Sequence, residues 1–192
     1  MSHLKRTMTL DNGTTSVVPR VDASTNAITT ITYPHHEIHG GSAYFQVYSA
    51  IKNDTEFIEV RIQTPNTTKW GHYELIIVGS LAGTVELWAA TTKTHAAGNV
   101  ITMVNRNFNS TNASGLTVCH TPAGAQAGVA SLGPQYYGAT ASGGRVSVGG
   151  GANSRGEFIL KQNTAYLIKN TSRADGNALS IIIDGYEHTD KG

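Results

Sequence analysis

Three side chains of the segment His35-His36-Glu37-Ile38-His39 have residue types and a spacing that suit a metal site. Side chains at alternate positions of a β-strand lie on one face. If the segment is a strand, His35, Glu37 and His39 converge, and two imidazoles with a carboxylate can hold zinc or iron. The segment lacks the helical HExxH spacing, and the later Glu and His of a cupin motif do not follow. We therefore interpret it as a polar strand entry, with a cupin-like metalloenzyme as a less favoured alternative.

The remaining reactive residues do not form a recognisable catalytic set. Neighbouring side chains of a strand point to opposite faces, so Cys119 and His120 are not expected to form a dyad. Cys119 is the single cysteine, and we expect it to be a buried structural residue. The carboxylates available for acid–base chemistry are expected on solvated strand faces; they are Glu56, Glu59, Glu74, Glu86, Glu157, Asp184 and Glu187. We expect no enzymatic activity, no bound metal and no cofactor.

The composition is polar without being charged. Charged residues make up 14% of the 192 residues, and the formal net charge is +1. Such a chain has no general electrostatic attraction for nucleic acid or anionic membranes. It also lacks the run of about 20 apolar residues that spans a bilayer, and no apolar segment follows the basic N-terminus as in a signal peptide. We expect no nucleic-acid partner, no membrane partner and no secretory route.

Hydrophobic residues alternate with polar ones from Ser42 onward. In residues 57–63 the alternation places Ile58, Val60 and Ile62 on one face of a strand, and Glu59 and Arg61 on the other. Similar runs occur at residues 43–51, 72–80, 84–90, 100–107, 116–121, 158–161, 166–170 and 179–186. Helical spacing does not persist over three turns in any window. The sequence therefore predicts an all-β fold, an antiparallel β-sandwich of jelly-roll type.

Two segments depart from this pattern. Residues 1–32 are rich in Ser, Thr and Asn and are interpreted as an extended N-terminal arm, leaving residues 33–192 as the β-sandwich domain. Residues 122–156 hold ten of the 21 glycines and form a Gly-rich excursion. Each segment is either a contact with a neighbouring molecule or a mobile stretch. The residues predicted to contact another subunit or a capsid are Arg6, Val17, Val18, Ile28, Ile31, Tyr136, Tyr137 and Arg145.

Four segments together resemble a group of small proteins encoded near the capsid genes of tailed bacteriophages. The segments are residues 64–72 (TPNTTKWGH), 105–110 (NRNFNS), 157–168 (EFILKQNTAYLI) and 184–189 (DGYEHT). The resemblance is to head decoration, or cement, proteins, and it covers the chain from Tyr33 to Thr189. It implies a β-sandwich or jelly-roll subunit that is made in the host cytoplasm and assembles as a homotrimer. On the outer surface of the virion it would bind the major capsid protein and stabilise the shell without catalysis.

A glycan-binding or receptor-binding β-sandwich of a virion or tail is the alternative. Such a protein needs exposed aromatic rings on which sugars can stack. Trp88 is in phase with Glu86, on the face opposite Val85 and Leu87, and is therefore a candidate stacking residue.

Overall fold

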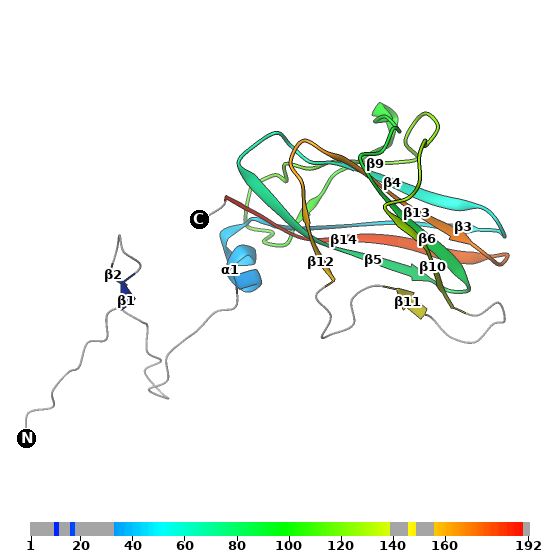
Figure 1. The fold of residues 1–192 in the computed structure, drawn as a ribbon. Coiled ribbons are helices and arrows are strands. Elements are labelled where there is room, and N and C mark those ends of the chain that lie inside the picture. Colours follow the sequence, from blue (N-terminus) through cyan, green and yellow to red (C-terminus); the bar gives the residue numbers. More distant parts are fainter. Residues whose placement is uncertain (1–9, 12–15, 18–32, 139–145, 149–155, 190–192) are drawn as a thin grey trace, which may run out of the picture.

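The computed structural model describes residues 10–11, 16–17, 33–138, 146–148 and 156–189. Two antiparallel β-sheets pack face to face, and one short helix lies beside them (Figure 1). Within the N-terminal arm, β1 (Leu10–Asp11) pairs with β2 (Ser16–Val17), and the rest of the arm lies outside the described residues. The predicted all-β sandwich is confirmed.

The first sheet, called sheet I, is built around β14. Its strand order is β11–β5–β14–β3–β8, and β12 pairs with β5 beside β11. The bounds are β3 (Ala43–Lys52), β5 (Lys69–Gly79), β8 (Val104–Asn105), β11 (Val146–Val148), β12 (Glu157–Leu160) and β14 (Asn177–Thr189).

The second sheet, called sheet II, is built around β13. Its strand order is β10–β6–β13–β4–β9–β7. The bounds are β4 (Phe57–Gln63), β6 (Gly83–Ala89), β7 (Val100–Ile101), β9 (Thr117–His120), β10 (Leu132–Tyr137) and β13 (Ala165–Ser172). A 3-10 turn, η1 (Ala97–Asn99), precedes β7.

The connections between the sheets give the fold its topology. The chain passes from β3 in sheet I to β4 in sheet II, back to β5, and then to β6. The last two strands also lie in different sheets. β13 lies between β4 and β6 in sheet II, and β14 lies between β3 and β5 in sheet I. This exchange of strands between two antiparallel sheets is the topology of a jelly roll. The residues between β6 and β10, called the 90–131 insertion, add β7 and β9 to sheet II and β8 to sheet I.

The alternation in the sequence corresponds to the buried face of each strand. Ile58, Val60 and Ile62 of β4 are at most 2% exposed and pack in one core with Ile181 and Ile183 of β14. Burying a large aliphatic side chain stabilises a fold by about 1.5–3 kcal/mol. The sandwich core between the sheets is therefore its main source of stability.

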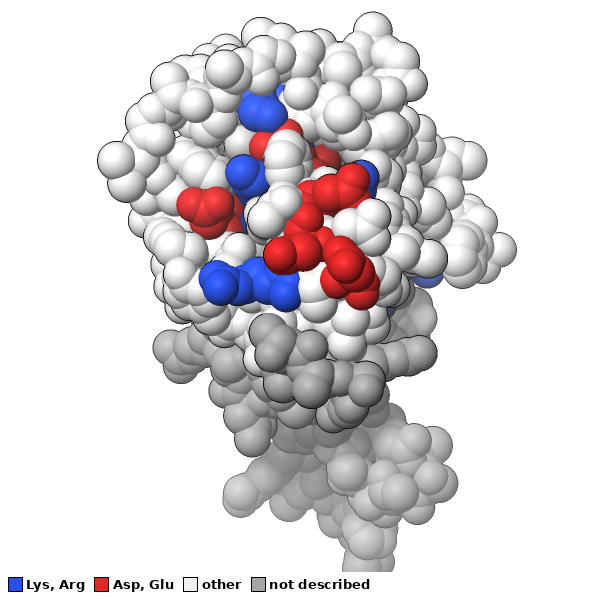
Figure 2. Space-filling model, turned by 90° about the vertical axis from the view of Figure 1, so that its right-hand side faces the viewer, with Lys and Arg blue, Asp and Glu red and all other residues white. Residues whose placement is uncertain are grey.

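The turns at one end of the sandwich carry charges of both signs. Figure 2 shows this end, which is on the right in Figure 1, and there the charged side chains gather in one area with uncharged residues around it. In the β3–β4 turn, the N–H of Asp54 donates to Asp175 Oδ1 (3.0 Å) and the N–H of Asn53 donates to Glu56 Oε2 (2.7 Å). Carboxylates here accept hydrogen bonds from the backbone of the turns.

The Gly-rich excursion contributes strands to both sheets. It contains β10, which pairs with β6, and β11, which pairs with β5. Tyr137 of β10 lies opposite Gly83, and it is 5% exposed. Its hydroxyl donates to the buried Asn170 (2.6 Å), and a Cβ atom at Gly79 or Gly83 would overlap its ring. The prediction that Tyr137 contacts another subunit is therefore wrong, because this side chain fills the core of its own chain.

Residues 33–40 form a helix, α1 (Tyr33–Gly40), and not the expected polar strand. Pro34 suits the first turn of a helix, where its missing N–H is not needed. The helix ends at Gly41, which has a φ of +71°, with hydrogen bonds from Gly41 N to Ile38 O (3.1 Å) and from Ser42 N to Glu37 O (2.9 Å). This pair of bonds is a Schellman motif. The segment is therefore helical, as the signals at its two ends favour, and not the strand that the alternating histidines predicted.

Gly185 of β14 provides a test of the close packing in sheet I. A Cβ atom at this position would lie 1.9 Å from the carbonyl oxygen of His72 and 2.8 Å from Cα of Tyr73. Because backbone atoms of a central strand cannot move aside, we expect Gly185→Ala to lower the free energy of unfolding by about 2–4 kcal/mol. Urea unfolding of the variant and of the unaltered protein measures this change in the free energy of unfolding. Gly133→Ala is the control, because nothing lies within 4 Å of a Cβ atom there, and an equal loss in both variants would contradict the packing argument.

Candidate functional site

The two outer faces of the sandwich differ. Tyr166 and Ile168 of β13 point into the core, so Leu167 between them points outward, and yet it is 0% exposed. Its cross-strand neighbour Trp88 is 8% exposed. Both are covered by the 90–131 insertion, whose Ser131 hydroxyl accepts a hydrogen bond from the N–H of Ala89 (2.9 Å). The outer face of sheet II is therefore closed by the chain itself.

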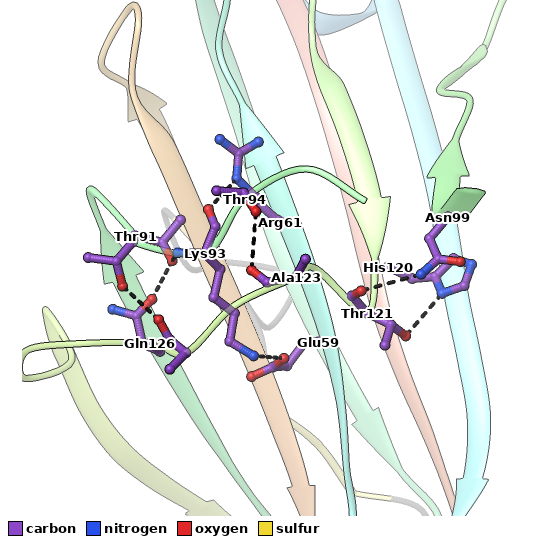
Figure 3. A network of polar contacts seen from close by, with 12 residues as sticks. Glu59, Arg61, Thr91, Lys93, Thr94, Asn99, His120, Thr121, Ala123 and Gln126 are labelled. Carbon is purple, nitrogen blue, oxygen red and sulfur yellow. Dashed lines mark hydrogen bonds and ion pairs between the residues drawn. The ribbon is translucent and has the colours of Figure 1, made fainter. Parts of the chain in front are cut away.

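A buried ion pair fixes the insertion on sheet II (Figure 3). Lys93 of the insertion pairs with Glu59 of β4, and their side chains are 11% and 6% exposed. Arg61 donates from Nε to the carbonyl oxygen of Lys93 (2.9 Å), and the N–H of Thr121 donates to the carbonyl oxygen of Glu59 (3.1 Å). The prediction that Glu59 lies on a solvated face is wrong, because the insertion supplies both its cover and its partner.

The outer face of sheet I carries an apolar band that no described segment covers. Cross-strand pairing places Val47, Ile182 and Ile76 in one row across β3, β14 and β5. Val47 is 44% exposed and Ile51, farther along β3, is 74% exposed. We define the apolar band as Val47, Ile51, Ile76, Val78 and Ile182. Exposed apolar side chains that adjoin one another mark sites of protein interaction more often than scattered ones do.

A polar groove lies beside the apolar band, at the end of sheet I near α1. Its volume is about 260 Å³, and its lining includes His72, Glu74, Arg106, Glu157, Asp184 and Tyr186. Three of its carboxylates form a single cross-strand row, because Glu157 pairs with Glu74 and Glu74 pairs with Asp184. Arg106 binds Asp184 through both Nε (2.8 Å) and Nη2, and its guanidinium lies 5.6 Å from the ring centre of Phe45. Two carboxylates of the row remain without an arginine partner among the described contacts.

His72 is the centre of a cluster of rings in this groove. Its Nδ1 lies 2.6 Å from Glu157 Oε1, and its Nε2 lies 2.8 Å from Nε2 of His188. The ring of Tyr186 stacks on that of His72, with 4.9 Å between the centres. These residues come from β5, β12 and β14, so no local sequence pattern could predict the cluster.

A further carboxylate, Glu187, is buried at the same end of the sandwich. It is 3% exposed and accepts hydrogen bonds from the Tyr73 hydroxyl (2.9 Å), the Ser114 hydroxyl and the N–H of Gly115 (2.9 Å). Burial, followed by the negative charge of Glu187, raises the pKa of both Tyr73 and Tyr44 above the usual value. Glu187 thus fastens the 90–131 insertion to β14, and the expectation that it is solvated is wrong.

The predicted metal ligands do not converge. A helix turns by about 100° per residue, so Glu37 projects away from His35 and His39. Those two histidines stack on the exposed side of α1, with Nε2 atoms 3.0 Å apart, and Glu37 is buried and bonded to Ser42. Across the described part of the chain, no three or more His, Cys, Asp or Glu side chains are arranged to hold a metal ion.

The predicted contact residues are only partly described. Tyr136 is 68% exposed, with Arg173 lying 5.2 Å from its ring centre. Val17 is described as a backbone position of β2. The others, Arg6, Val18, Ile28, Ile31 and Arg145, lie outside the described residues.

Two further side chains can be compared with expectation. Cys119 is 0% exposed, which confirms that it is a buried residue. His120 points the other way and stacks on Tyr48, at 4.6 Å between ring centres. Trp88 is buried, so the prediction that it offers an exposed stacking surface is wrong, because the insertion covers it.

Comparison with protein-family models, curated proteins and solved structures finds no match. Among the described residues, α1 is the longest helix, and no helix there has the length and hydrophobicity needed to cross a bilayer.

The Lys93–Glu59 pair can be tested by a double-mutant cycle. Lys93→Met leaves a buried carboxylate without its partner, so we expect the free energy of unfolding to fall by about 3 kcal/mol. Adding Glu59→Leu removes the unpaired charge and should restore much of that loss. Urea unfolding of the variants measures both effects, and the exposed Lys161→Met serves as the control. Additive losses from the two substitutions would contradict a coupled pair.

The buried tyrosines predict a decline in stability at alkaline pH. Because folding raises the pKa of Tyr73, its contribution to stability is fully present below its unfolded pKa of 10.0 and is lost as pH rises above that value. Tyr73→Phe should make this decline shallower and lower stability at neutral pH by about 1 kcal/mol, since Glu187 loses one donor. Unfolding curves between neutral pH and about pH 11 measure it. The exposed Tyr136→Phe should keep the original slope, and an unchanged slope in Tyr73→Phe would refute the assignment.

Proposed function

We propose that this chain is a structural virion protein that binds the outside of a phage capsid and stabilises the shell. The apolar band of sheet I is the observation that carries the proposal. The major capsid protein is the partner, and the protein acts as a homotrimer on the outer surface of the virion without catalysis. The number three comes from the sequence resemblance to decoration proteins, and we infer the contact surfaces from exposed apolar side chains of the described residues.

The asymmetry of the two outer faces supports this role. The chain uses the 90–131 insertion to cover Trp88 and Leu167 on sheet II, while the apolar band on sheet I has no cover among the described residues. A rigid sheet face loses little conformational entropy on binding, since its side chains already have neighbours in their own sheet. On the side away from the groove, Ser49 and Ser180 share a cross-strand row with Val78, and a hydroxyl that finds a partner is easier to bury than a charge. Such a face suits a permanent contact with a shell.

The edge of β10 that pairs with no described strand supports self-association. Tyr136 and Leu132 are 68% and 43% exposed there, and β10 is an outer strand of sheet II. Tyrosine is enriched in protein interfaces because it buries a large ring while keeping a polar group. We assign this edge to the subunit contact and the apolar band to the capsid contact.

The glycan-binding alternative gains less support from the geometry. Its candidate platform, Trp88, is buried. In the polar groove, one face of the Tyr186 ring is covered by His72. Binding to a glycan array without binding to shells would favour this alternative over the proposal.

Sedimentation with empty shells of the encoding phage tests the function. We expect the purified protein to sediment with the shells at a ratio of three chains per occupied site. Val47→Lys places a charge in the apolar band and should weaken attachment by at least about tenfold, because the charge must be desolvated on binding.

Val100→Lys is the matched control, because this valine is 54% exposed on β7, at the far edge of sheet II. It should sediment with shells as the unaltered protein does. No binding of the unaltered protein, or equal weakening by both substitutions, would contradict the proposed role of the apolar band. Light scattering of the free protein measures the subunit number separately, and a dimer would contradict the trimer alone.

A further inference from the structure

Two imidazole rings meet nitrogen to nitrogen at the polar groove. His72 lies on β5 and His188 on β14, and the register places them as diagonal neighbours, since His72 pairs with Tyr186 and His188 pairs with Trp70. Their Nε2 atoms are 2.8 Å apart. At this distance one atom must donate a hydrogen to the other, or both must bind a third species.

The partners of the other ring nitrogens decide which atoms carry protons. Nδ1 of His72 lies 2.6 Å from a carboxylate oxygen of Glu157, and Nδ1 of His188 lies 2.9 Å from the carbonyl oxygen of Thr189. An ionised carboxylate and a carbonyl only accept hydrogen bonds, so each Nδ1 is the donor. When both rings are neutral, each has a single N–H, and both Nε2 atoms then present lone pairs to each other.

We propose that His72 and His188 bind a divalent transition-metal ion of the zinc class through these Nε2 atoms. The two lone pairs repel each other when nothing lies between them. A cation placed between them removes this repulsion, because each nitrogen then coordinates the ion. Histidine ligands of metals commonly donate their other N–H to a carboxylate or a backbone carbonyl, which fixes the tautomer and orients the ring. Glu157 and the Thr189 carbonyl already supply both of these outer contacts.

The spacing of the nitrogens agrees with this assignment. Zinc–imidazole bonds are about 2.0–2.1 Å long, so two nitrogens on one ion lie about 2.9 Å apart at a right angle and about 3.4 Å apart in a tetrahedron. The rings would separate by a few tenths of an ångström to hold a tetrahedral ion. Because no three protein ligands converge in the described part of the chain, water completes the coordination shell from the groove.

The charge of the groove also favours a cation. Glu157, Glu74 and Asp184 form one row beside the histidines, and Arg106 is the basic side chain among the lining residues. Three carboxylates against one guanidinium leave the lining of the groove negative. The carboxylates do not make the site, but they raise the local concentration of cations around the two nitrogens.

A second histidine pair among the described residues, on α1, provides a natural comparison. His35 and His39 also have Nε2 atoms close together, at 3.0 Å, but they lie one turn apart on the exposed side of α1. Among the hydrogen bonds of the described residues, none joins Nδ1 of either ring, so none of these bonds fixes a tautomer. The His72–His188 pair is the preorganised one, and we expect it to bind the ion more tightly.

Calorimetric titration of the full chain with zinc chloride tests the proposal. We expect one zinc ion per chain, with binding lost in His72→Phe, which keeps a ring to stack on Tyr186, and lost in His188→Gln. Glu157→Gln should weaken binding by about tenfold or more, because the tautomer of His72 is no longer held by a charge. His39→Gln is the matched control and should retain the affinity of the unaltered protein. Circular dichroism verifies the fold of each variant.

The tautomers give an independent readout on the unaltered protein. Long-range proton–nitrogen spectra of the metal-free chain should show His72 and His188 protonated on Nδ1, with their Nε2 resonances shifting when zinc is added. Spectra that show one ring with two N–H groups, together with no uptake of zinc, would mean that a shared proton joins the rings, and the proposal would be wrong. Zinc uptake that survives in both His72→Phe and His188→Gln would also overturn it.

Discussion

Both sheets depend on the last two strands of the chain. β14 pairs with β3 and β5, from Asn177 to Thr189, and β13 pairs in the same way with β4 and β6. The earlier strands of each sheet therefore have no common neighbour until residues 165–189 are in place. Pairings this distant in sequence make folding slow, because loop closure precedes most of the stabilising contacts. The site shares this dependence, since Asp184, Tyr186 and His188 all lie on β14.

The strands that could be predicted from the sequence are those with one face in the core. β3, β4, β13 and β14 alternate over long runs because their inner residues meet the opposite sheet, and the pattern of period two records this burial. The alternation did not show which charged side chains are covered by distant parts of the chain. Glu59 is buried because Lys93 lies over it, and Glu187 is buried because Ser114 and Gly115 fold back onto it. Contacts between distant residues leave no periodic trace.

The candidate site could not be predicted from the sequence for the same reason: its residues are distant from one another in the chain. The histidines closest together in the sequence, between His35 and His39, drew attention as a metal site, but local helix signals separate Glu37 from them. The cluster that does form joins His72, Glu157 and His188 from three strands, 85 and 116 residues away from His72. Strand register, which a single sequence does not specify over such distances, brings them together.

Apolar side chains on both outer faces of the sandwich need to be shielded from water, and the two faces differ in how this is done. An antiparallel sheet with one face in the core commonly has polar residues on the other. Here both outer faces hold large apolar side chains, Trp88 and Leu167 on sheet II and the apolar band on sheet I. On sheet II the 90–131 insertion excludes water. A buried ion pair and backbone hydrogen bonds hold the insertion in place. An equivalent cover for sheet I would gain a comparable hydrophobic stabilisation. The described residues supply no such cover, and the capsid contact that we propose would bury the same side chains.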